Sequence, residues 1–207
     1  MPRIAEHREA AEPSSPEQKD RVRRILRAAA EHGTAHPLER VQMQEVARDA
    51  GVAIATLYRY FPSKTHLFTA LLHHQVGGLQ RWAASPAPGL APDEAVAEVL
   101  VEAQRRLQER PQLALAMLQS NNAAVGPSPS MAVTSTFADL ILATAGVEVP
   151  TAHDHRLVRL IEQTWYGVLM SRLNGHIDDA EAESDTRLAC ALLLGGIGRP
   201  DPTKETP

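Results

Sequence analysis

The stretch that decides the fold is MQEVARDAGVAIATLYRYFPSK, residues 43–64. It holds two short segments whose apolar residues recur at helical spacing, with Gly51 between them. A tight turn needs a positive φ, which glycine adopts at the least steric cost. The inward-facing apolar positions of the two segments are Val46, Ala47, Ala50, Val52, Leu57 and Tyr60. Because each residue type has a steric reason at its place, the stretch predicts a helix-turn-helix.

The second helix of this hairpin carries a surface suited to DNA. Its first turn is small and apolar around Ala55, which allows close approach to a groove floor and to thymine methyl groups. Hydroxyl and cationic groups that can donate to phosphate oxygens follow at Tyr58, Arg59, Tyr60, Ser63 and Lys64. The stretch therefore predicts a clamp on the DNA backbone around a groove-reading helix. The alternative is that Tyr58 and Tyr60 are core aromatics of an ordinary helical hairpin.

The charge distribution supports the DNA interpretation weakly. The whole chain has a net charge of −4, which alone argues against a nucleic-acid partner. Residues 17–66, however, carry nine Lys or Arg against six Asp or Glu, a net of +3. Residues 81–207 carry ten basic against sixteen acidic residues, a net of −6. A basic front on an acidic body directs a protein toward phosphates.

The composition predicts an all-α fold. Aromatic residues make up only 4% of the 207 residues, so Ala, Leu, Val and Ile must build the core. No apolar run approaches the ~20 residues that cross a bilayer, and the first residues lack the apolar stretch of a signal peptide. The single cysteine, Cys190, cannot form an intramolecular disulfide. We therefore expect a cytoplasmic protein without membrane contact.

Helical periodicity and turn residues divide the chain into about nine helices. We expect helices at 16–31, 42–50, 53–61, 64–84, 93–110, 111–123, from 131 to about 145, at 155–174 and at 180–195. Gly33 is expected to end the first helix, Ser63 to cap the fourth, and Asp154 to cap the eighth. The clearest linker is 85–94, and further breaks lie at 126–130 and 146–154.

The residues GVAIATLYRYFPSKTHLFTALL resemble the motif of TetR-type transcriptional regulators, and the resemblance extends over about residues 19–75. It implies a domain organisation of a disordered arm (1–16), a DNA-binding domain (17–66), a ligand-binding and dimerisation domain (67–198) and a tail (199–207). It also implies roles for single residues at the DNA. Those expected at phosphates are Gln42, Gln44, Tyr58, Tyr60 and Lys64, and those expected at bases are Ile54, Ala55 and Thr56.

Within that family, ERVQMQEVA and ATLYRYFPSKTHL most resemble the actinobacterial repressors of cholesterol catabolism. This likeness implies a hydrophobic effector such as a steroid or an acyl-CoA thioester. The apolar positions expected to line its pocket are Leu113, Met117, Leu118, Phe137, Ile141, Trp165, Tyr166 and Met170, with Asn121 as a polar neighbour. Each of them could equally be ordinary core.

The two last helices are expected to form the seam of a homodimer, as the resemblance implies. Candidate seam residues are Leu157, Leu160, Ile161, Trp165, Leu169, Leu188, Leu192 and Leu193, although the same spacing also suits an intrachain core. A dimer fits the DNA interpretation, because two reading helices related by a two-fold axis bind two half-sites about 34–36 Å apart.

Enzyme chemistry is not expected from this sequence. Adjacent histidines, as in His73-His74, point to different sides of a helix and make poor metal ligands. The Glu-x-x-His pattern of carboxylate-bridged di-iron bundles is missing, and the glycines at 195–198 lack the Lys and Ser or Thr of a phosphate loop. We therefore predict a ligand-responsive, dimeric DNA-binding repressor without a cofactor or metal. The alternative is an all-α small-molecule-binding protein whose reading helix is degenerate.

Overall fold

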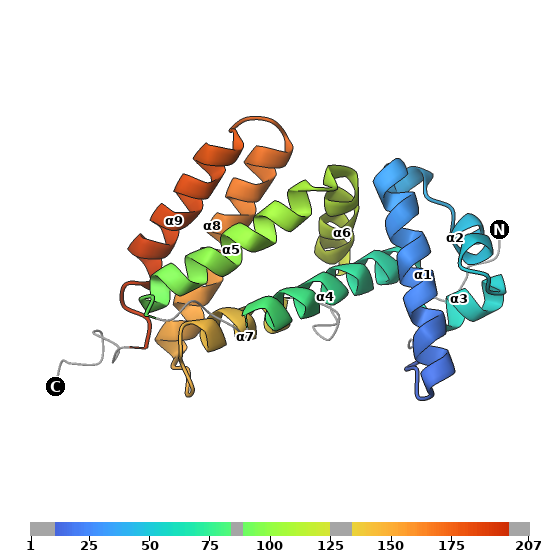
Figure 1. Ribbon diagram of the computed structural model, residues 1–207, viewed down its shortest axis with the longest axis horizontal. Coiled ribbons are helices and arrows are strands. Elements are labelled where there is room, and N and C mark those ends of the chain that lie inside the picture. Colours follow the sequence, from blue (N-terminus) through green and yellow to red (C-terminus); the bar gives the residue numbers. More distant parts are fainter. Residues whose placement is uncertain (1–10, 84–88, 125–133, 199–207) are drawn as a thin grey trace. The chain divides into compact units, whose positions relative to one another are not determined.

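The computed structural model describes residues 11–83, 89–124 and 134–198 (Figure 1). Over these residues the chain forms nine α-helices and one 3-10 helix, and no strand. The all-α fold class is confirmed. The break expected at 126–130 and the tail lie outside the described residues, as do parts of the arm and of the 85–94 linker. None of the helices in the described ranges is long and apolar enough to cross a membrane.

The chain divides into two compact units. Residues 1–75 and 110–133 belong to the first, and residues 76–109 and 134–207 to the second. The first unit holds α1 (Pro16–Ala35), η1 (Leu38–Arg40), α2 (Met43–Asp49), α3 (Ile54–Tyr60), the start of α4 (Lys64–Ala83) and α6 (Pro111–Ala124). The second holds the end of α4, α5 (Pro92–Gln108), α7 (Thr134–Thr144), α8 (Ala152–Leu173) and α9 (Asp179–Leu194).

The turn of the helix-turn-helix forms where the sequence predicts it. Gly51 has φ of +64° and directly follows the C-cap of α2. The Val52 amide donates to the Ala47 carbonyl at 3.0 Å, and the Gly51 amide to the Arg48 carbonyl at 3.0 Å. These bonds close the end of α2 as a glycine cap does. The core of the hairpin consists of the buried side chains of Val46, Ala47, Ala50, Leu57 and Tyr60, with Val52 half-buried.

The first helix extends past its expected end. We expected Gly33 to terminate it, and this was wrong, because α1 continues to Ala35 with Gly33 buried inside it. A Cβ at Gly33 would lie 2.6 Å from Cε1 of Phe68 on α4 and 2.9 Å from Cδ1 of Leu113 on α6. The glycine is therefore needed for the close approach of α1 to these two helices, and its conformational freedom is not used.

Gly33→Ala is expected to destabilise the protein, although alanine is the better helix former by about 1 kcal/mol. Phe68 and Leu113 are buried and cannot swing away from the new methyl group, and such overpacking costs about 1–3 kcal/mol. Urea denaturation should show a lower free energy of unfolding than in the wild type. Gly77→Ala is the matched control, since its Cβ would meet no atom closer than 3.9 Å, and it should leave stability equal or higher.

The second unit is built around the pair α8 and α9, which lie side by side and are joined by the short loop at 174–178 (Figure 1). Both helices begin with a capping box. We expected Asp154 to be the N-cap of α8, but Thr151 takes that place and Asp154 is the third residue of the helix. Thr151 caps the helix because its extended backbone leaves its hydroxyl free to accept from the Asp154 amide at 3.2 Å.

Asp154 also binds the segment that follows α9. It is 1% exposed, and its carboxylate accepts bonds from the Thr151 amide at 2.8 Å and from the Gly198 amide at 2.9 Å. Burial alone would raise the pKa of this carboxyl, but the hydrogen bonds outweigh it and the pKa is lowered. The charged form therefore holds the segment after α9 against the start of α8.

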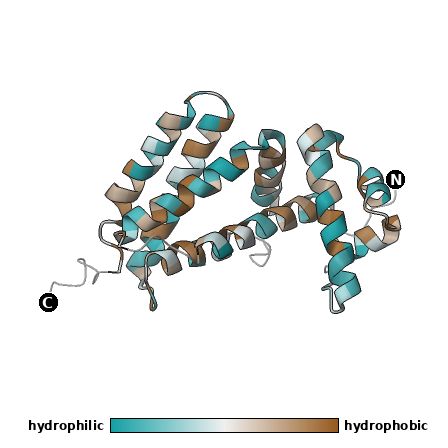
Figure 2. Ribbon diagram, viewed as in Figure 1, coloured by the Kyte–Doolittle hydropathy of each residue, from teal (hydrophilic) through white to brown (hydrophobic). Residues whose placement is uncertain are grey.

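Trp165 of α8 lies at the centre of the second unit. Its Nε1 donates to the Leu100 carbonyl of α5 at 3.1 Å, and its ring centroid lies 5.2 Å from that of Phe137 on α7. A second buried polar link joins Thr186 of α9 to Gln104 of α5 at 3.2 Å. Figure 2 shows hydrophobic and hydrophilic residues alternating along α5 and α8, as expected of helices that bury one face.

Candidate nucleic-acid interface and ligand site

Helix α3 carries the residues that we expect, from the family resemblance, to face DNA bases. Ile54 is 37% exposed, Ala55 is exposed and Thr56 is half-buried, whereas Leu57 packs into the core of the first unit. The first turn of α3 therefore presents a small, mostly apolar surface. A surface of this kind can approach the floor of a major groove and contact thymine methyl groups.

The expected phosphate contacts at the two glutamines and at Tyr58 also lie on the surface. Gln42 is the N-cap of α2, where its carbonyl accepts from the amides of Glu45 and Val46, both at 3.1 Å. Its side chain makes no capping bond within the described residues and is exposed, as is that of Gln44. Tyr58 is 38% exposed. All three side chains are available to donate to a ligand.

Tyr60 and Lys64 are already engaged within the first unit. Tyr60 is 3% exposed, and its hydroxyl accepts from the guanidinium of Arg59 at 3.1 Å. Lys64 Nζ donates to the carbonyls of Leu38 at 2.7 Å and Glu39 at 3.1 Å, which ties the start of α4 to η1. Burial lowers the pKa of Lys64. Packing explains the position of Tyr60, and hydrogen bonds within the unit explain that of Lys64. Their contacts with phosphate stay a prediction.

The expected cap of α4 is confirmed. The Ser63 hydroxyl accepts from the His66 amide at 3.2 Å and lies 2.7 Å from Nδ1 of the same residue. Burial lowers the pKa of His66, which favours the neutral imidazole. The first turn of α4 is therefore fixed by its own residues.

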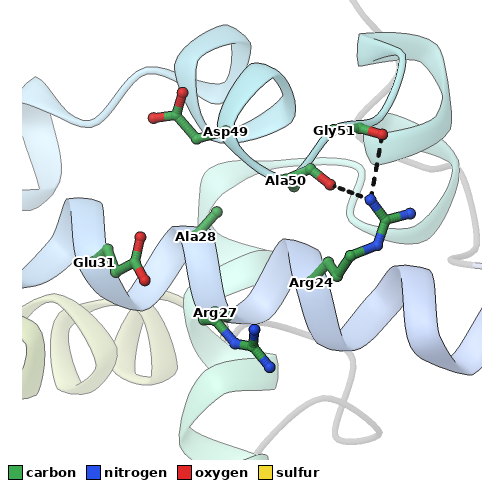
Figure 3. A pocket seen from close by; sticks show the side chains of 7 residues that line it. All are labelled: Arg24, Arg27, Ala28, Glu31, Asp49, Ala50 and Gly51. Atoms are coloured by element: carbon green, nitrogen blue, oxygen red, sulfur yellow. Dashed lines mark hydrogen bonds between the residues drawn. The ribbon is translucent and has the colours of Figure 1, made fainter.

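An open pocket of about 250 Å³ lies between α1 and the end of α2 (Figure 3). Its lining consists of Arg24, Arg27, Ala28, Glu31, Asp49, Ala50 and Gly51. Arg24 reaches across it to the turn of the helix-turn-helix. Sequence reasoning missed this residue, because an arginine on the polar face of α1 carries no signal of what it bonds to in the fold.

The residues expected to line a ligand pocket fall into both units. Leu113, Met117 and Leu118 are buried on α6 of the first unit, and Asn121 of the same helix is half-buried. In the second unit, Phe137, Ile141 and Trp165 are buried, and Tyr166 and Met170 are half-buried. Phe137 and Trp165 form a ring pair within the second unit. Their role as a lining stays a prediction.

Several buried polar atoms have no hydrogen-bond partner among the described residues. They are Oγ1 of Thr69 and Oγ of Ser120 in the first unit, and Nε2 of Gln108 and Oε1 of Glu162 in the second. Burial raises the pKa of Glu162 to about 7. Sequence reasoning missed Glu162, although a signal existed: it lies three residues before Trp165 and four after Val158, on the apolar side of α8.

The described residues offer no support for metal or thiol chemistry. Among them, no three His, Cys, Asp or Glu side chains gather as a metal site requires. Cys190 is buried in α9, and burial raises the pKa of its thiol to about 12, so the nucleophilic thiolate is not formed at neutral pH.

A helix-turn-helix with an exposed reading turn, followed by a mainly helical body, defines a class of DNA-binding regulators. Residues 25–71 match the model of the bacterial regulatory proteins of the tetR family, and residues 89–193 match a tetracyclin repressor-like C-terminal domain. The chain belongs to the TetR family, and it is a regulator rather than an enzyme.

The chain is similar to KstR repressors and to a TetR regulator of known structure. The chain is 32% identical to the HTH-type transcriptional repressor KstR of Rhodococcus jostii over 91% of this chain and 90% of the relative. It is 29% identical to KstR of Mycobacterium tuberculosis over 89% and 86%. A crystal structure of a TetR transcriptional regulator from Rhodococcus sp. RHA1 superposes with a TM-score of 0.80 at 48% identity, covering 86% of this chain and 97% of that one.

Proposed function

We propose that the protein is a ligand-responsive repressor that binds a palindromic operator as a homodimer and releases it when a hydrophobic small molecule binds. The observation that carries the proposal is the exposed first turn of α3 on a helix-turn-helix whose inner face buries Leu57 and Tyr60. The 17–66 segment is the DNA-binding domain and 67–198 the ligand-binding and dimerisation domain. Such a regulator acts in the cytoplasm, where its operator lies.

At the operator, the reading turn of Ile54, Ala55 and Thr56 faces the bases. The phosphate contacts come from Gln42, Gln44, Tyr58, Tyr60 and Lys64. For Tyr60 the contact is limited to its hydroxyl end, because the ring is packed. Lys64 adds its positive charge while it remains bonded to the carbonyls of η1. The contacts to the backbone fix the register, and the bases are then read by the first turn of α3.

The dimer forms through the exposed apolar side chains of α8 and α9. Of the seam candidates, Ile161, Trp165 and Leu169 are buried in the second unit and belong to its own core. Leu160, Leu188 and Leu192 are 40%, 58% and 75% exposed. Exposed leucines that recur on paired helices are typical of a face covered by another protein surface. The KstR relatives are named as repressors, and a second copy of this chain fits a two-fold operator.

The double substitution Leu188→Glu and Leu192→Glu is expected to give a folded monomer, because both side chains lie on the surface of the second unit. Sedimentation or light scattering should show half the wild-type mass. Operator affinity should fall by at least about 100-fold, since a single reading head loses the second half-site. Ala143→Glu, at an exposed position of α7 outside the proposed seam, controls for added charge. A double variant that stays dimeric would place the seam elsewhere.

The effector is a hydrophobic molecule, with a steroid or an acyl-CoA thioester as the leading classes. The support is the similarity to KstR and the apolar character of the expected lining residues Phe137, Ile141 and Trp165 within the second unit.

The test is a fluorescence-anisotropy titration with DNA from upstream of the protein's own gene and scrambled DNA of equal length, at two salt concentrations. Tight binding to the upstream probe and weak, salt-dependent binding to the scrambled one is the expected result. Release of the first complex by steroids or acyl-CoA thioesters would then identify the effector class. Equal weak binding to both probes would favour the second candidate, a small-molecule-binding protein with a degenerate reading helix.

A further inference from the structure

Arg24 of α1 joins the first helix to the turn of the helix-turn-helix. Its guanidinium NH1 donates to the Ala50 carbonyl at 2.7 Å and lies 3.5 Å from the Gly51 carbonyl (Figure 3). Its Nε lies 3.7 Å from the carboxylate of Asp20, one turn earlier on α1. These contacts connect positions 26 and 27 residues apart in the sequence. The arginine therefore links an element that does not read DNA to the turn that orients the one that does.

The turn needs such a donor. Bonds from the amides of Ala50, Gly51 and Val52 close the last turn of α2, but they leave the carbonyls of Ala50 and Gly51 without a helical amide. The C-terminal end of a helix, here that of α2, also carries partial negative charge. A guanidinium placed there satisfies both demands at once, through a charge-assisted hydrogen bond of short length.

The turn is crowded as well as bonded. A Cβ on Gly51 would lie 3.1 Å from NH1 of Arg24, at a backbone whose φ of +64° already disfavours other residues. Arg24 thus packs on the glycine that it bonds. Because the turn is held from α1 in this way, the angle between α2 and α3 is fixed by more than the apolar core of the hairpin.

We propose that Arg24 is a positioning residue for operator recognition, which holds α3 in the orientation that reads bases and makes no contact with phosphate. The arginine is counted in the basic front of the chain, so charge alone would assign it to the DNA backbone. The bond geometry assigns its charge to the protein's own turn. The inference rests on the proposed DNA-binding function and specifies how its reading helix is held.

The experiment measures operator and scrambled-DNA affinity of the full chain against salt concentration, for wild type, Arg24→Met and Arg24→Lys. Arg24→Met should lose roughly tenfold in operator affinity, the scale expected for one charge-assisted hydrogen bond. Affinity for scrambled DNA should fall much less, so the ratio of the two affinities falls. The slope of log affinity against log salt should equal that of the wild type, whereas loss of a phosphate contact would reduce it by about 0.9.

Arg27→Met is the matched control. Arg27 lies on the same helix and lines the same pocket, but Figure 3 shows its side chain pointing away from the two carbonyls. Its removal subtracts the same charge, and the ratio of operator to scrambled affinity should stay unchanged. Arg24→Lys keeps the charge and a donor, and it should recover part of the ratio that Arg24→Met loses.

Two results would overturn the proposal. One is an equal loss in Arg24→Met and Arg27→Met, which would reduce the effect to net charge. The other is a smaller salt slope in Arg24→Met than in wild type, which would place the guanidinium at a phosphate. Circular dichroism of each variant confirms that it is folded. If the wild type itself fails to distinguish the two DNAs, the proposed function fails, and this outcome is separate from the other two.

Discussion

Ala55→Glu is expected to remove specific operator binding from a protein that remains folded. Ala55 is exposed on the first turn of α3, so the longer side chain displaces nothing in the core. Glutamate is also favourable in the first turn of a helix. At the DNA, however, its carboxylate would face the groove between two phosphate backbones. Like charges brought together at an interface cost several kcal/mol, so affinity should fall by at least about 100-fold.

Ala180→Glu is a closely matched control for this variant. Ala180 is the second residue of α9, as Ala55 is of α3, and it is exposed as well. Both substitutions add one negative charge at the same position of a helix. Anisotropy titration should show normal operator binding for Ala180→Glu, and thermal denaturation should show both variants folded. If Ala55→Glu binds the operator as the wild type does, the first turn of α3 does not read the DNA.

The DNA-reading half of the molecule was predictable because its constraints are local. The spacing of Val46, Ala50, Leu57 and Tyr60 identifies the inward faces of two short helices, and Gly51 identifies the turn between them. All these features act within about fifteen residues, where helical periodicity and turn chemistry decide the backbone. The cap at Ser63 was predictable for the same reason.

Contacts between distant segments were not predictable in this way. Gly33 looks like a helix terminator in the sequence, and only the positions of Phe68 and Leu113 show that it is a packing residue. Lys64 looks like a phosphate ligand, yet its ammonium is held by the carbonyls of η1, 25 and 26 residues earlier. The bond from Arg24 to the turn has the same character. Charge in a sequence does not reveal the partner with which it is paired.

Only the exposed fraction of each side chain distinguishes the dimer-seam candidates of α8 and α9 from the core residues of the second unit. Ile161, Trp165 and Leu169 of α8 recur at the spacing of a helical core. Leu160 of α8 and the leucines Leu188 and Leu192 of α9 also fit an apolar helix face. Periodicity assigns them all to an apolar face, because it does not distinguish a surface covered by the same chain from one covered by a second copy. The exposed fractions divide the eight seam candidates into three core residues and three candidates for the dimer, and the remaining two, Leu157 and Leu193, are half-buried.

Trp165→Ala is expected to destabilise the whole second unit, by about 3–5 kcal/mol, as large-to-small changes at buried aromatic positions do. Trp165 is 8% exposed, and its loss removes the ring contact with Phe137 and the bond from Nε1 to the Leu100 carbonyl. Three helices, α5, α7 and α8, lose a common contact. Urea denaturation, monitored by circular dichroism, should show the lower free energy of unfolding.

This cost determines how the effector hypothesis must be tested at Trp165. A variant that no longer responds to effector could lack a pocket wall or could lack a folded unit, and Trp165→Ala does not separate the two. Trp165→Phe keeps most of the ring volume and loses the Nε1 donor, so about 1 kcal/mol of stability is at stake. If Trp165→Phe is folded, binds the operator and still releases it at wild-type effector concentrations, Trp165 is a core residue. If release needs more effector while unfolding is nearly unchanged, its indole contacts the effector.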